Sequence, residues 1–149
     1  MRHFIRDAVH ADADRIAAFN TAMAFETEHI QLQASTVLAG VRAVLERAEL
    51  GRYYVVQSGD DVCACLLITY EWSDWRNGIV WWIQSVYVIP AKRQQGIFTA
   101  MYDHMRNAAT TAGAVGLRLY VERDNTRAQR TYRALGMDET HYRLYEDLF

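Results

Sequence analysis

The stretch that decides the fold of this chain reads Val86-Tyr87-Val88-Ile89-Pro90-Ala91-Lys92-Arg93-Gln94-Gln95-Gly96-Ile97-Phe98-Thr99. Its first part is rich in β-branched and aromatic residues, which favour a strand, and Pro90, the only proline in the sequence, ends that strand. Gly96 follows at the start of a helix, where glycine lets the backbone approach a ligand closely. The backbone N–H groups from Gln94 to Thr99 converge at that helix N-terminus, which favours an anion. We interpret the stretch as a pyrophosphate-binding turn; a strand-turn-helix without a ligand is the alternative.

Composition indicates one domain over residues 1–149 that acts on a small molecule. The sequence has 149 residues and 51% hydrophobic content, enough for one core and too few for two ordinary domains. A net charge of −2 gives no general attraction to polyanions, so we expect neither nucleic acid nor a membrane as partner. The charged N-terminus and the lack of a long apolar run favour a cytoplasmic protein.

The two cysteines give no sign of a disulfide or a metal site. Cys63 and Cys65 lie two residues apart in an expected strand, which places both side chains on the same face with poor geometry for a bridge. We expect a buried, reduced pair rather than a catalytic thiol, and no metal.

Periodicity and turn signals predict an α/β fold in which strands and helices form a mixed sheet with helical layers. Asp12 is a candidate N-cap for the first helix and Gly51 the stop of the second. The expected strands are 3–8, 53–57, 62–70, 81–88, 116–121, 137–139 and 142–147; the expected helices are 12–23, 35–50, 95–112 and 126–135; loops are expected at 25–29 and 72–78.

A second segment, residues 121–137, adds a further pattern. It contains Asn125, Ala128 and Tyr132, followed by Leu135-Gly136-Met137. Together with Arg93 and Gly96, this pattern resembles the GNAT superfamily of N-acetyltransferases, and the match extends in element order over nearly the whole chain. One departure is Phe98, which stands where the family has a small residue. The resemblance implies a central mixed β-sheet of about seven strands flanked by about four helices.

The same resemblance implies acetyl-CoA as acetyl donor and assigns most of the donor site. The pyrophosphate is expected on Arg93, Gln94, Gln95, Gly96, Ile97, Phe98 and Thr99. The pantetheine arm is expected along the backbones of Val86, Tyr87 and Val88, where one N–H polarises the thioester carbonyl, and on Asn125. A simple helix N-cap is the alternative for Asn125. Tyr132 is expected to protonate the leaving thiolate, since a phenol and a thiol have similar pKa values, and a packing tyrosine is the alternative.

The general base is harder to find. Family members often carry a carboxylate at the position that Trp82 occupies here, and an indole cannot accept a proton. Alternation places Trp82, Gln84, Val86 and Val88 on one face, so Gln84 can orient a substrate or a water. Carboxylates near the expected acceptor cleft are Glu26, Glu28, Glu71 and Asp74, each with a solvated loop residue as the alternative. Glu28 is our first choice for the helper base, and the neighbouring His29 is a weaker candidate.

All four tryptophans, Trp72, Trp75, Trp81 and Trp82, fall between residues 72 and 82. Mixed with acidic residues, this aromatic group suits a cationic amine through cation–π contacts, and we assign Glu26, Trp72, Trp82 and Gln84 to the substrate. A packed hairpin or a homodimer contact explains the same group of aromatics.

These patterns predict an enzyme that transfers an acetyl group from acetyl-CoA directly to the amine of a small, cationic acceptor. No covalent enzyme intermediate is expected, because no nucleophile and base pair is evident. The alternatives are a non-catalytic acyl-CoA-binding or regulatory module and an enzyme that acetylates a protein or peptide amine. The presence of Asn125 and Tyr132 favours an enzyme, and the slightly acidic balance disfavours a macromolecular acceptor.

Overall fold

The structure is a computed structural model that describes residues 2–149. One mixed β-sheet lies at the centre of its fold. Its strands are β1 (His3–Asp7), β2 (Arg52–Ser58), β3 (Asp61–Ser73), β4 (Gly78–Val88) and β5 (Gly116–Leu119), and they lie side by side in that order. The first four pair antiparallel, whereas β4 and β5 pair in parallel. The predicted mixed sheet is therefore confirmed over the described residues, with five strands in place of seven.

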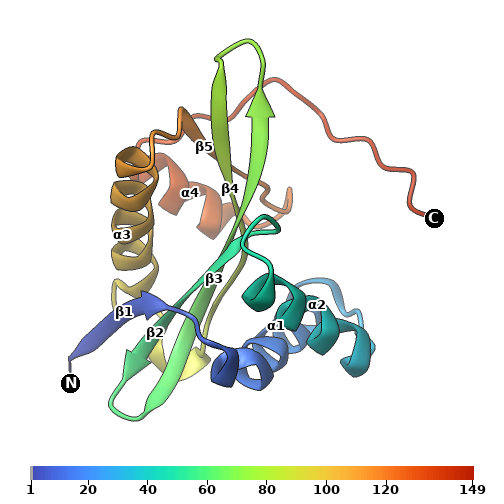
Figure 1. The fold of residues 1–149 in the computed structure, drawn as a ribbon, viewed down its shortest axis with the longest axis vertical. Coiled ribbons are helices and arrows are strands. Elements are labelled where there is room, and N and C mark those ends of the chain that lie inside the picture. The colour runs from blue at the N-terminus through green and yellow to red at the C-terminus, as the bar shows by residue number, and fades with distance from the viewer. Residues whose placement is uncertain (1) are drawn as a thin grey trace.

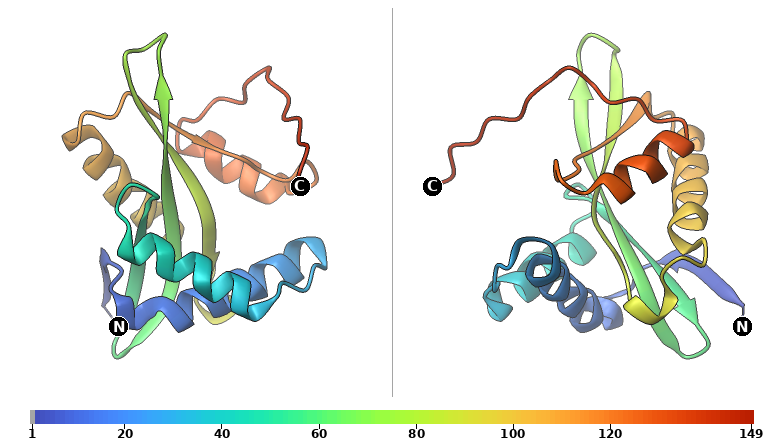
Figure 2. Two further views of the ribbon diagram at one scale, coloured as in Figure 1. Left: turned by 45° about the vertical axis from the view of Figure 1, so that its right-hand side comes forward. Right: turned by 180° about the vertical axis from the view of Figure 1, so that it is seen from behind.

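Helices cover both faces of this sheet (Figures 1 and 2). The helices α1 (Ala13–Glu28) and α2 (Ala34–Glu46) lie on one face, and α3 (Ile97–Thr111) and α4 (Thr126–Ala134) lie on the other. Two short 3₁₀ turns, η1 (His10–Asp12) and η2 (Pro90–Lys92), precede α1 and α3. The four predicted helices are present. Among residues 2–149, no helix has the length and apolar character needed to cross a lipid bilayer.

Each face of the sheet has its own hydrophobic core. On the α3 face, the fully buried Leu66 packs with Met105 of α3. On the α1 face, the fully buried Cys65 packs with Ile16 of α1. Because neighbouring residues of a strand point to opposite faces, β3 serves both cores.

A bulge separates the two cysteines. Val56 pairs with Ala64 and Gln57 with Val62, so Cys63 is an extra residue on β3 and joins the α3-side core while Cys65 joins the other. The predicted common face is wrong, because a bulge shifts the alternation by one residue. Both thiols are free and buried, as predicted, and burial raises the pKa of Cys65 to about 12.

The helix α1 is longer than predicted. The loop expected at 25–29 is wrong, because the helix continues to Glu28 and ends at His29 in a left-handed conformation (φ 55°). The stretch holds neither glycine nor proline, and the Thr27 hydroxyl donates to a carbonyl one turn earlier at 2.8 Å. Glu26 and Glu28 thus lie on the last helical turn.

Gly51 does not stop α2, which ends at Glu46. A Cβ at Gly51 would lie 2.5 Å from the carbonyl oxygen of Ile68. Glycine is required there by close backbone approach rather than by a helix C-cap.

The β2–β3 hairpin is confirmed, while the β3–β4 hairpin is longer than predicted. Ser73 pairs with Gly78, so only residues 74–77 form the turn expected at 72–78, with Asn77 in a left-handed conformation (φ 48°). The hairpin projects from the body of the fold (Figure 1).

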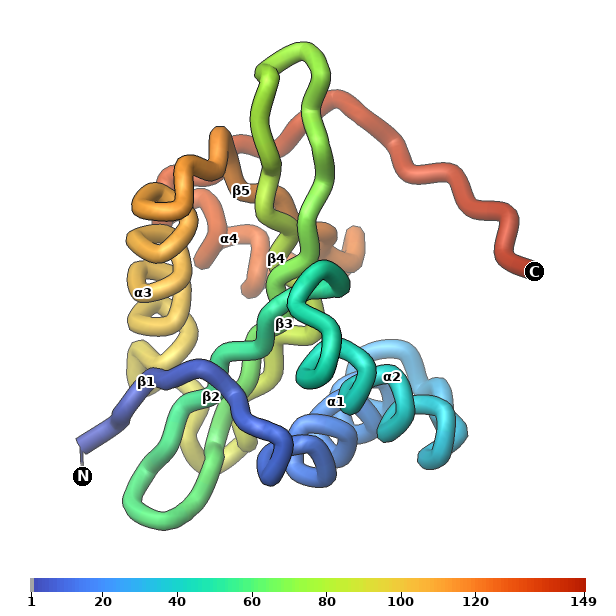
Figure 3. Tube along the Cα trace, in the orientation of Figure 1, coloured from blue at the N-terminus to red at the C-terminus, as the bar shows by residue number. Residues whose placement is uncertain are grey.

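The predicted strands at 137–139 and 142–147 are absent from the chain as described. Residues 138–149, which we call the C-terminal arm, are all exposed and run away from the helices (Figures 1 and 3). A strand pattern forms a sheet only where an edge is available to pair with it.

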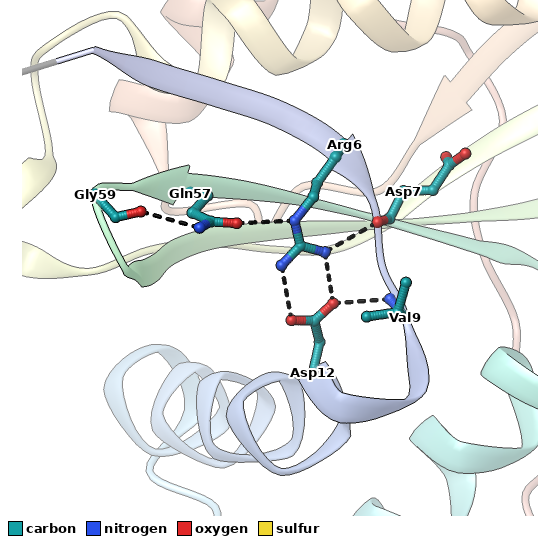
Figure 4. Close-up of polar contacts among 6 residues, drawn as sticks. All are labelled: Arg6, Asp7, Val9, Asp12, Gln57 and Gly59. Carbon is teal, nitrogen blue, oxygen red and sulfur yellow. Dashed lines mark hydrogen bonds and ion pairs between the residues drawn. The ribbon is translucent and has the colours of Figure 1, made fainter.

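A polar network ties β1 to the start of α1 (Figure 4). Arg6 donates to both carboxylate oxygens of Asp12, at 2.8 and 3.0 Å, and the Val9 N–H donates to Asp12 at 2.8 Å. Arg6 also donates to the Gln57 side chain of β2 at 3.0 Å. Asp12 occupies the predicted N-cap position of α1, but its side chain makes no capping hydrogen bond to that helix. Its carboxylate instead accepts from Arg6 and Val9, which ties the start of α1 to β1.

Candidate functional site

The pairing of β4 with β5 ends halfway along β4. Val80 pairs with Gly116 and Ile83 with Leu119, after which β5 ends while β4 continues to Val88 along β3 only. We call this point the β4–β5 fork. Two parallel strands that part at their carboxyl ends leave backbone groups for a ligand, as at the switch points of α/β sheets. Val86, Tyr87 and Val88, on which the resemblance predicts the pantetheine arm, lie on this unpaired edge.

A second bulge lies inside the fork. Leu67 pairs with Gln84 and Cys65 with Tyr87, so β4 has one residue more than β3 here, and Ser85 adopts φ 50°. The bulge reverses the alternation along β4.

The predicted common face of Trp82, Gln84, Val86 and Val88 is therefore wrong. Val86 and Val88 pack on the α3-side core, whereas Tyr87 joins the α1-side core. By register, Trp82 and Gln84 pair with Thr69 and Leu67 and face the α1 side. The side chains of Trp82 and Gln84 thus face the α1 side of the sheet, and those of Val86 and Val88 face the α3 side.

The turn after β4 has the geometry of an anion site. Gln94 (φ 62°) and Gly96 (φ 78°) are both left-handed, and α3 begins at Ile97. Over the residues that the structure describes, no protein acceptor takes a hydrogen bond from the backbone N–H groups of 94–99. A Cβ at Gly96 would meet no atom within 4 Å. Free donors facing open space at a helix N-terminus fit a diphosphate.

The side chain of Arg93 does not point freely into this turn. Its Nε donates to the carbonyl of Val88 and its Nη2 to Glu26, each at 2.8 Å, and its guanidinium lies 5.3 Å from the centre of the Tyr87 ring. The Tyr87 hydroxyl donates to the same carboxylate at 2.9 Å. Glu26, predicted to bind the acceptor, therefore links α1 to the anion turn.

This network changes the ionisation of its members. The hydrogen bond from Arg93 is the main cause that lowers the pKa of Glu26. Burial is the main cause that raises the pKa of Tyr87. Glu26 is thus a carboxylate with reduced basicity, suited to electrostatics more than to proton transfer.

Two side chains of α4 face the anion turn. The Tyr132 ring meets the Phe98 ring edge-on at 5.8 Å, and burial raises the pKa of Tyr132. The Gln94 amide, oriented with its oxygen as acceptor, takes a hydrogen bond from Arg127. Phe98, the large residue where the resembled family has a small one, thus contacts Tyr132 at the start of α3.

Asn125 caps α4. Its Oδ1 accepts a hydrogen bond from the Ala128 N–H at 3.2 Å, so the capping alternative raised by the sequence is what the structure shows. Its side-chain NH₂ group remains available to a ligand, since the carboxamide oxygen alone serves the cap.

The α1 face of the sheet above the fork is lined by polar and aromatic residues. Trp82 packs on Tyr120 with ring centres 4.6 Å apart, and the Gln84 amide donates to the Thr69 hydroxyl at 2.6 Å. Beside them, Arg118 of β5 forms an ion pair with Glu71 of β3. We call these six residues the acceptor face.

Sequence reasoning missed Thr69, Arg118 and Tyr120 as site residues. Arg118 and Tyr120 alternate with Leu117 and Leu119, a strand pattern that placed them on the face opposite the core. That signal was present but indicated only a polar face.

Other predicted residues lie apart from this face. By register, Trp72 is on the α3 face, paired with Ile79, and Trp75 at the hairpin tip is 86% exposed. The structure therefore does not place Trp72 on the acceptor face, and its assignment to the substrate stays a prediction. Glu28 lies two residues beyond Glu26, about 200° further around the helix. In residues 2–149 it has no ion-pair partner.

Comparison with known proteins gives a consistent result. A family model described as the acetyltransferase (GNAT) family matches residues 4–137. Among solved structures, "a possible acetyltransferase from Clostridium difficile 630" is 42% identical with a TM-score of 0.92, and the match covers 100% of this chain and 99% of that one. No curated protein matches the sequence significantly.

Two more distant structures share the fold. A "predicted acetyltransferase with acetyl-CoA from Clostridium acetobutylicum" is 18% identical, with a TM-score of 0.82 and coverage of 98% and 96%. AAC(6')-Iy, solved with the bisubstrate analog CoA-S-monomethyl-acetylneamine, is 17% identical, with a TM-score of 0.79 and coverage of 100% and 99%.

Proposed function

This chain belongs to the acetyltransferase (GNAT) family, and from that membership we propose that it transfers an acetyl group from acetyl-CoA to the amine of a small, cationic acceptor. One observation carries the proposal. The free N–H groups of residues 94–99 lie directly after the unpaired edge of β4, with Tyr132 beside them. This arrangement offers an anion site, an extended backbone edge and a proton donor in succession.

On the donor side, residues 93–99 would bind the diphosphate of acetyl-CoA mainly through backbone N–H groups. The pantetheine amides would pair with the unpaired backbone of residues 86–88, in the way that an extended peptide adds to a sheet edge. Asn125 would contribute its side-chain NH₂ group. A backbone N–H on this edge would polarise the thioester carbonyl where negative charge develops.

The chemistry is a direct acyl transfer. The lone pair of the neutral amine attacks the thioester carbonyl carbon, the new C–N bond forms, and the C–S bond breaks. Tyr132 donates its hydroxyl proton to the departing thiolate, and the amine gives up one proton to water or to a helper carboxylate. Because burial raises the pKa of Tyr132, its hydroxyl stays protonated through neutral pH.

On the acceptor side, the aromatic side chains support a cation. The rings of Trp82 and Tyr120, whose centres lie 4.6 Å apart, offer π faces to an ammonium group. Gln84, held by Thr69, would orient the amine or a water. Because Glu28 lies apart from the acceptor face, it is proposed as a helper base that takes the proton through a chain of water molecules. The lowered pKa of Glu26 leaves Glu26 an electrostatic role.

The test is release of free CoA thiol from acetyl-CoA in the presence of amines grouped by charge: polyamines, neutral monoamines, anionic amino acids and basic peptides. Turnover with cationic small amines is the expected result. Tight acetyl-CoA binding with no thiol release from any amine would instead indicate a binding module. Turnover restricted to peptides would replace the small acceptor with a protein.

A further inference from the structure

Ser85, at the bulge of β4, has a strained backbone conformation. Its φ of 50° lies in the left-handed region, which residues other than glycine rarely adopt. At this point Ser85 and Val86 of β4 stand opposite the single residue Leu66 of β3. A strained residue of this kind persists only where the contacts around it hold it in place. The neighbours of Ser85 must therefore offset the strain.

The backbone of Ser85 is held by Cys65 of β3. The Cys65 thiol donates a hydrogen bond to the Ser85 carbonyl, with 3.5 Å between Sγ and the oxygen. Burial raises the pKa of Cys65 to about 12, so the thiol keeps its hydrogen through neutral pH. Cys65 therefore acts as a hydrogen-bond donor at the bulge and not as a nucleophile, which would have to be a thiolate.

The side chain of Ser85 is held by Tyr53 of β2, which is 5% exposed. Burial is the main cause that raises the pKa of Tyr53, and hydrogen bonds with Asn20 and Ser85 lower it. The side-chain NH₂ group of Asn20 donates to the Tyr53 hydroxyl at 3.3 Å. The Tyr53 hydroxyl thus joins α1 to the bulge. We call three residues the bulge support: Asn20, Tyr53 and Cys65.

Asn20 is not explained by stability alone. Within residues 2–149, its carboxamide oxygen is buried and has no hydrogen-bond partner. A buried acceptor without a partner lowers the stability of a fold, and an apolar side chain at this position would avoid that cost. What Asn20 adds is a hydrogen-bond donor to Tyr53. That contact acts on the bulge, which lies inside the β4–β5 fork.

The bulge decides which backbone groups of β4 face the open edge of the fork. The N–H of Ile89 donates to the Cys63 carbonyl of β3 at 3.0 Å. From the other side, the Arg93 side chain donates to the Val88 carbonyl at 2.8 Å. The N–H and C=O of one residue in an antiparallel pair point to the same edge, and successive residues alternate. Val86 and Val88 therefore present their N–H groups to the open edge.

We propose that Asn20 and Tyr53 are positioning residues for acetyl transfer. They hold Ser85, and with it the bulge, in the conformation that aims the N–H groups of the open edge at the acetyl-CoA thioester. This role rests on the proposed function, and both residues act through Ser85 rather than on the substrates. Backbone donors that are aligned with developing negative charge act mostly on the transition state. Loss of the bulge support should therefore lower kcat far more than it weakens acetyl-CoA binding.

Tyr53→Phe tests this role, and Tyr54→Phe is its matched control. Tyr54 is the next residue on β2, is 1% exposed and packs on the opposite face of the sheet. In the described chain its hydroxyl has no hydrogen-bond partner. Kinetics and calorimetry should give Tyr53→Phe a kcat about tenfold to a hundredfold lower, with an unchanged Kd for acetyl-CoA. Tyr54→Phe should keep the kcat of the unsubstituted chain. Equal kcat values for the two folded variants, or a loss confined to Kd, overturn the proposal.

A double variant tests whether Asn20 acts through Tyr53. Asn20→Leu should also lower kcat, and its combination with Tyr53→Phe should lower kcat no further than Tyr53→Phe alone. Thermal transitions check that each variant folds. Effects that multiply in the double variant overturn the shared route through Tyr53.

The backbone of Ser85 gives a readout that does not depend on activity. In NMR spectra of the protein without substrates, the three-bond coupling between the N–H and Hα protons of Ser85 reports its φ. This coupling should change in Tyr53→Phe and stay the same in Tyr54→Phe. An unchanged coupling in Tyr53→Phe overturns the positioning role, whether or not the chain is an enzyme. If the coupling changes but the unsubstituted chain releases no thiol with any amine, the proposed function fails instead.

Discussion

Replacement of Gly96 by alanine isolates the anion turn. Gly96 has φ 78°, and a Cβ there would meet no protein atom within 4 Å. The free protein therefore has no steric clash with the new methyl group and bears only the cost of a left-handed alanine. With acetyl-CoA bound, the methyl group would project into the space through which phosphate oxygens approach the N–H groups.

The chain offers a matched control in Gly113. It has φ 82°, its Cβ would also meet nothing within 4 Å, and it lies just beyond the other end of α3. A left-handed non-glycine residue costs about 1–2 kcal/mol, which for a domain of this size lowers the melting temperature by about 2–8 °C. Gly96→Ala and Gly113→Ala should therefore lose similar stability.

Only the Gly96 variant should lose affinity for the donor. We expect its Kd for acetyl-CoA in titration calorimetry to rise by about tenfold or more, which is at least about 1.4 kcal/mol, while Gly113→Ala binds as the unsubstituted chain does. Folding of both variants is checked by their thermal transitions. Equal affinities in the two folded variants would refute the placement of the diphosphate on this turn.

Four further substitutions test the proton donor, the helper base, the contact between Glu26 and Arg93, and the scaffold. Tyr132→Phe should lower kcat by about tenfold to a thousandfold with an unchanged KM for acetyl-CoA, and an unaltered kcat would leave Tyr132 a packing residue. Glu28→Gln should raise the acceptor KM by about two- to fivefold and leave the acetyl-CoA KM unchanged. Glu26→Gln should instead alter the acetyl-CoA KM, because it releases Arg93. Steady-state kinetics in which each substrate is varied in turn separates the two effects. The hydrogen bond from Arg6 is the main cause that lowers the pKa of Asp12 in the folded protein. The contribution of the Asp12 carboxylate to the free energy of unfolding is therefore complete above the ordinary carboxyl pKa of about 3.9. It disappears as the pH falls through the lower pKa of the folded state. Asp12→Asn should thus cost about 2 kcal/mol in urea unfolding at pH 7, and that difference should shrink at acid pH; a difference that stays constant with pH contradicts the ion-pair account.

Local sequence signals predicted the elements that depend on local chemistry. The strand-turn-helix from β4 to α3 was readable because Pro90 and Gly96 mark its boundaries. The β2–β3 hairpin was readable because Gly59 supplies the left-handed turn residue (φ 64°). These features need no knowledge of distant residues.

The features that sequence reasoning missed depend on partners elsewhere in space. No residue type in the sequence marks the bulge at Ser85. The bulge arises from the pairing with β3, where two residues of β4 stand opposite one residue of β3. The strand pattern of the arm was recognised, yet its pairing depends on an edge that the pattern does not name. The helical extension to Glu28 was missed, although nothing in that stretch breaks a helix, and its Glu26 contacts Arg93 and Tyr87, which lie far along the chain.

The bulge at Ser85 has a consequence for how this protein can diversify. Upstream of it, the side chains of β4 that face α1 belong to the acceptor face; downstream, those that face α3 belong to the core beneath the fork. A variant library at Trp82 and Gln84 could therefore alter acceptor choice while leaving the buried layer under residues 86–88 intact. Deletion of Ser85 would instead disturb the donor side, because it removes the bulge and reverses the side-chain alternation of residues 86–88. Tyr87 would turn toward α3 and lose its contact with Glu26, and Val86 and Val88 would turn toward α1. Under the proposed function, acceptor specificity would change by single substitutions, whereas the donor site would tolerate no change in strand length.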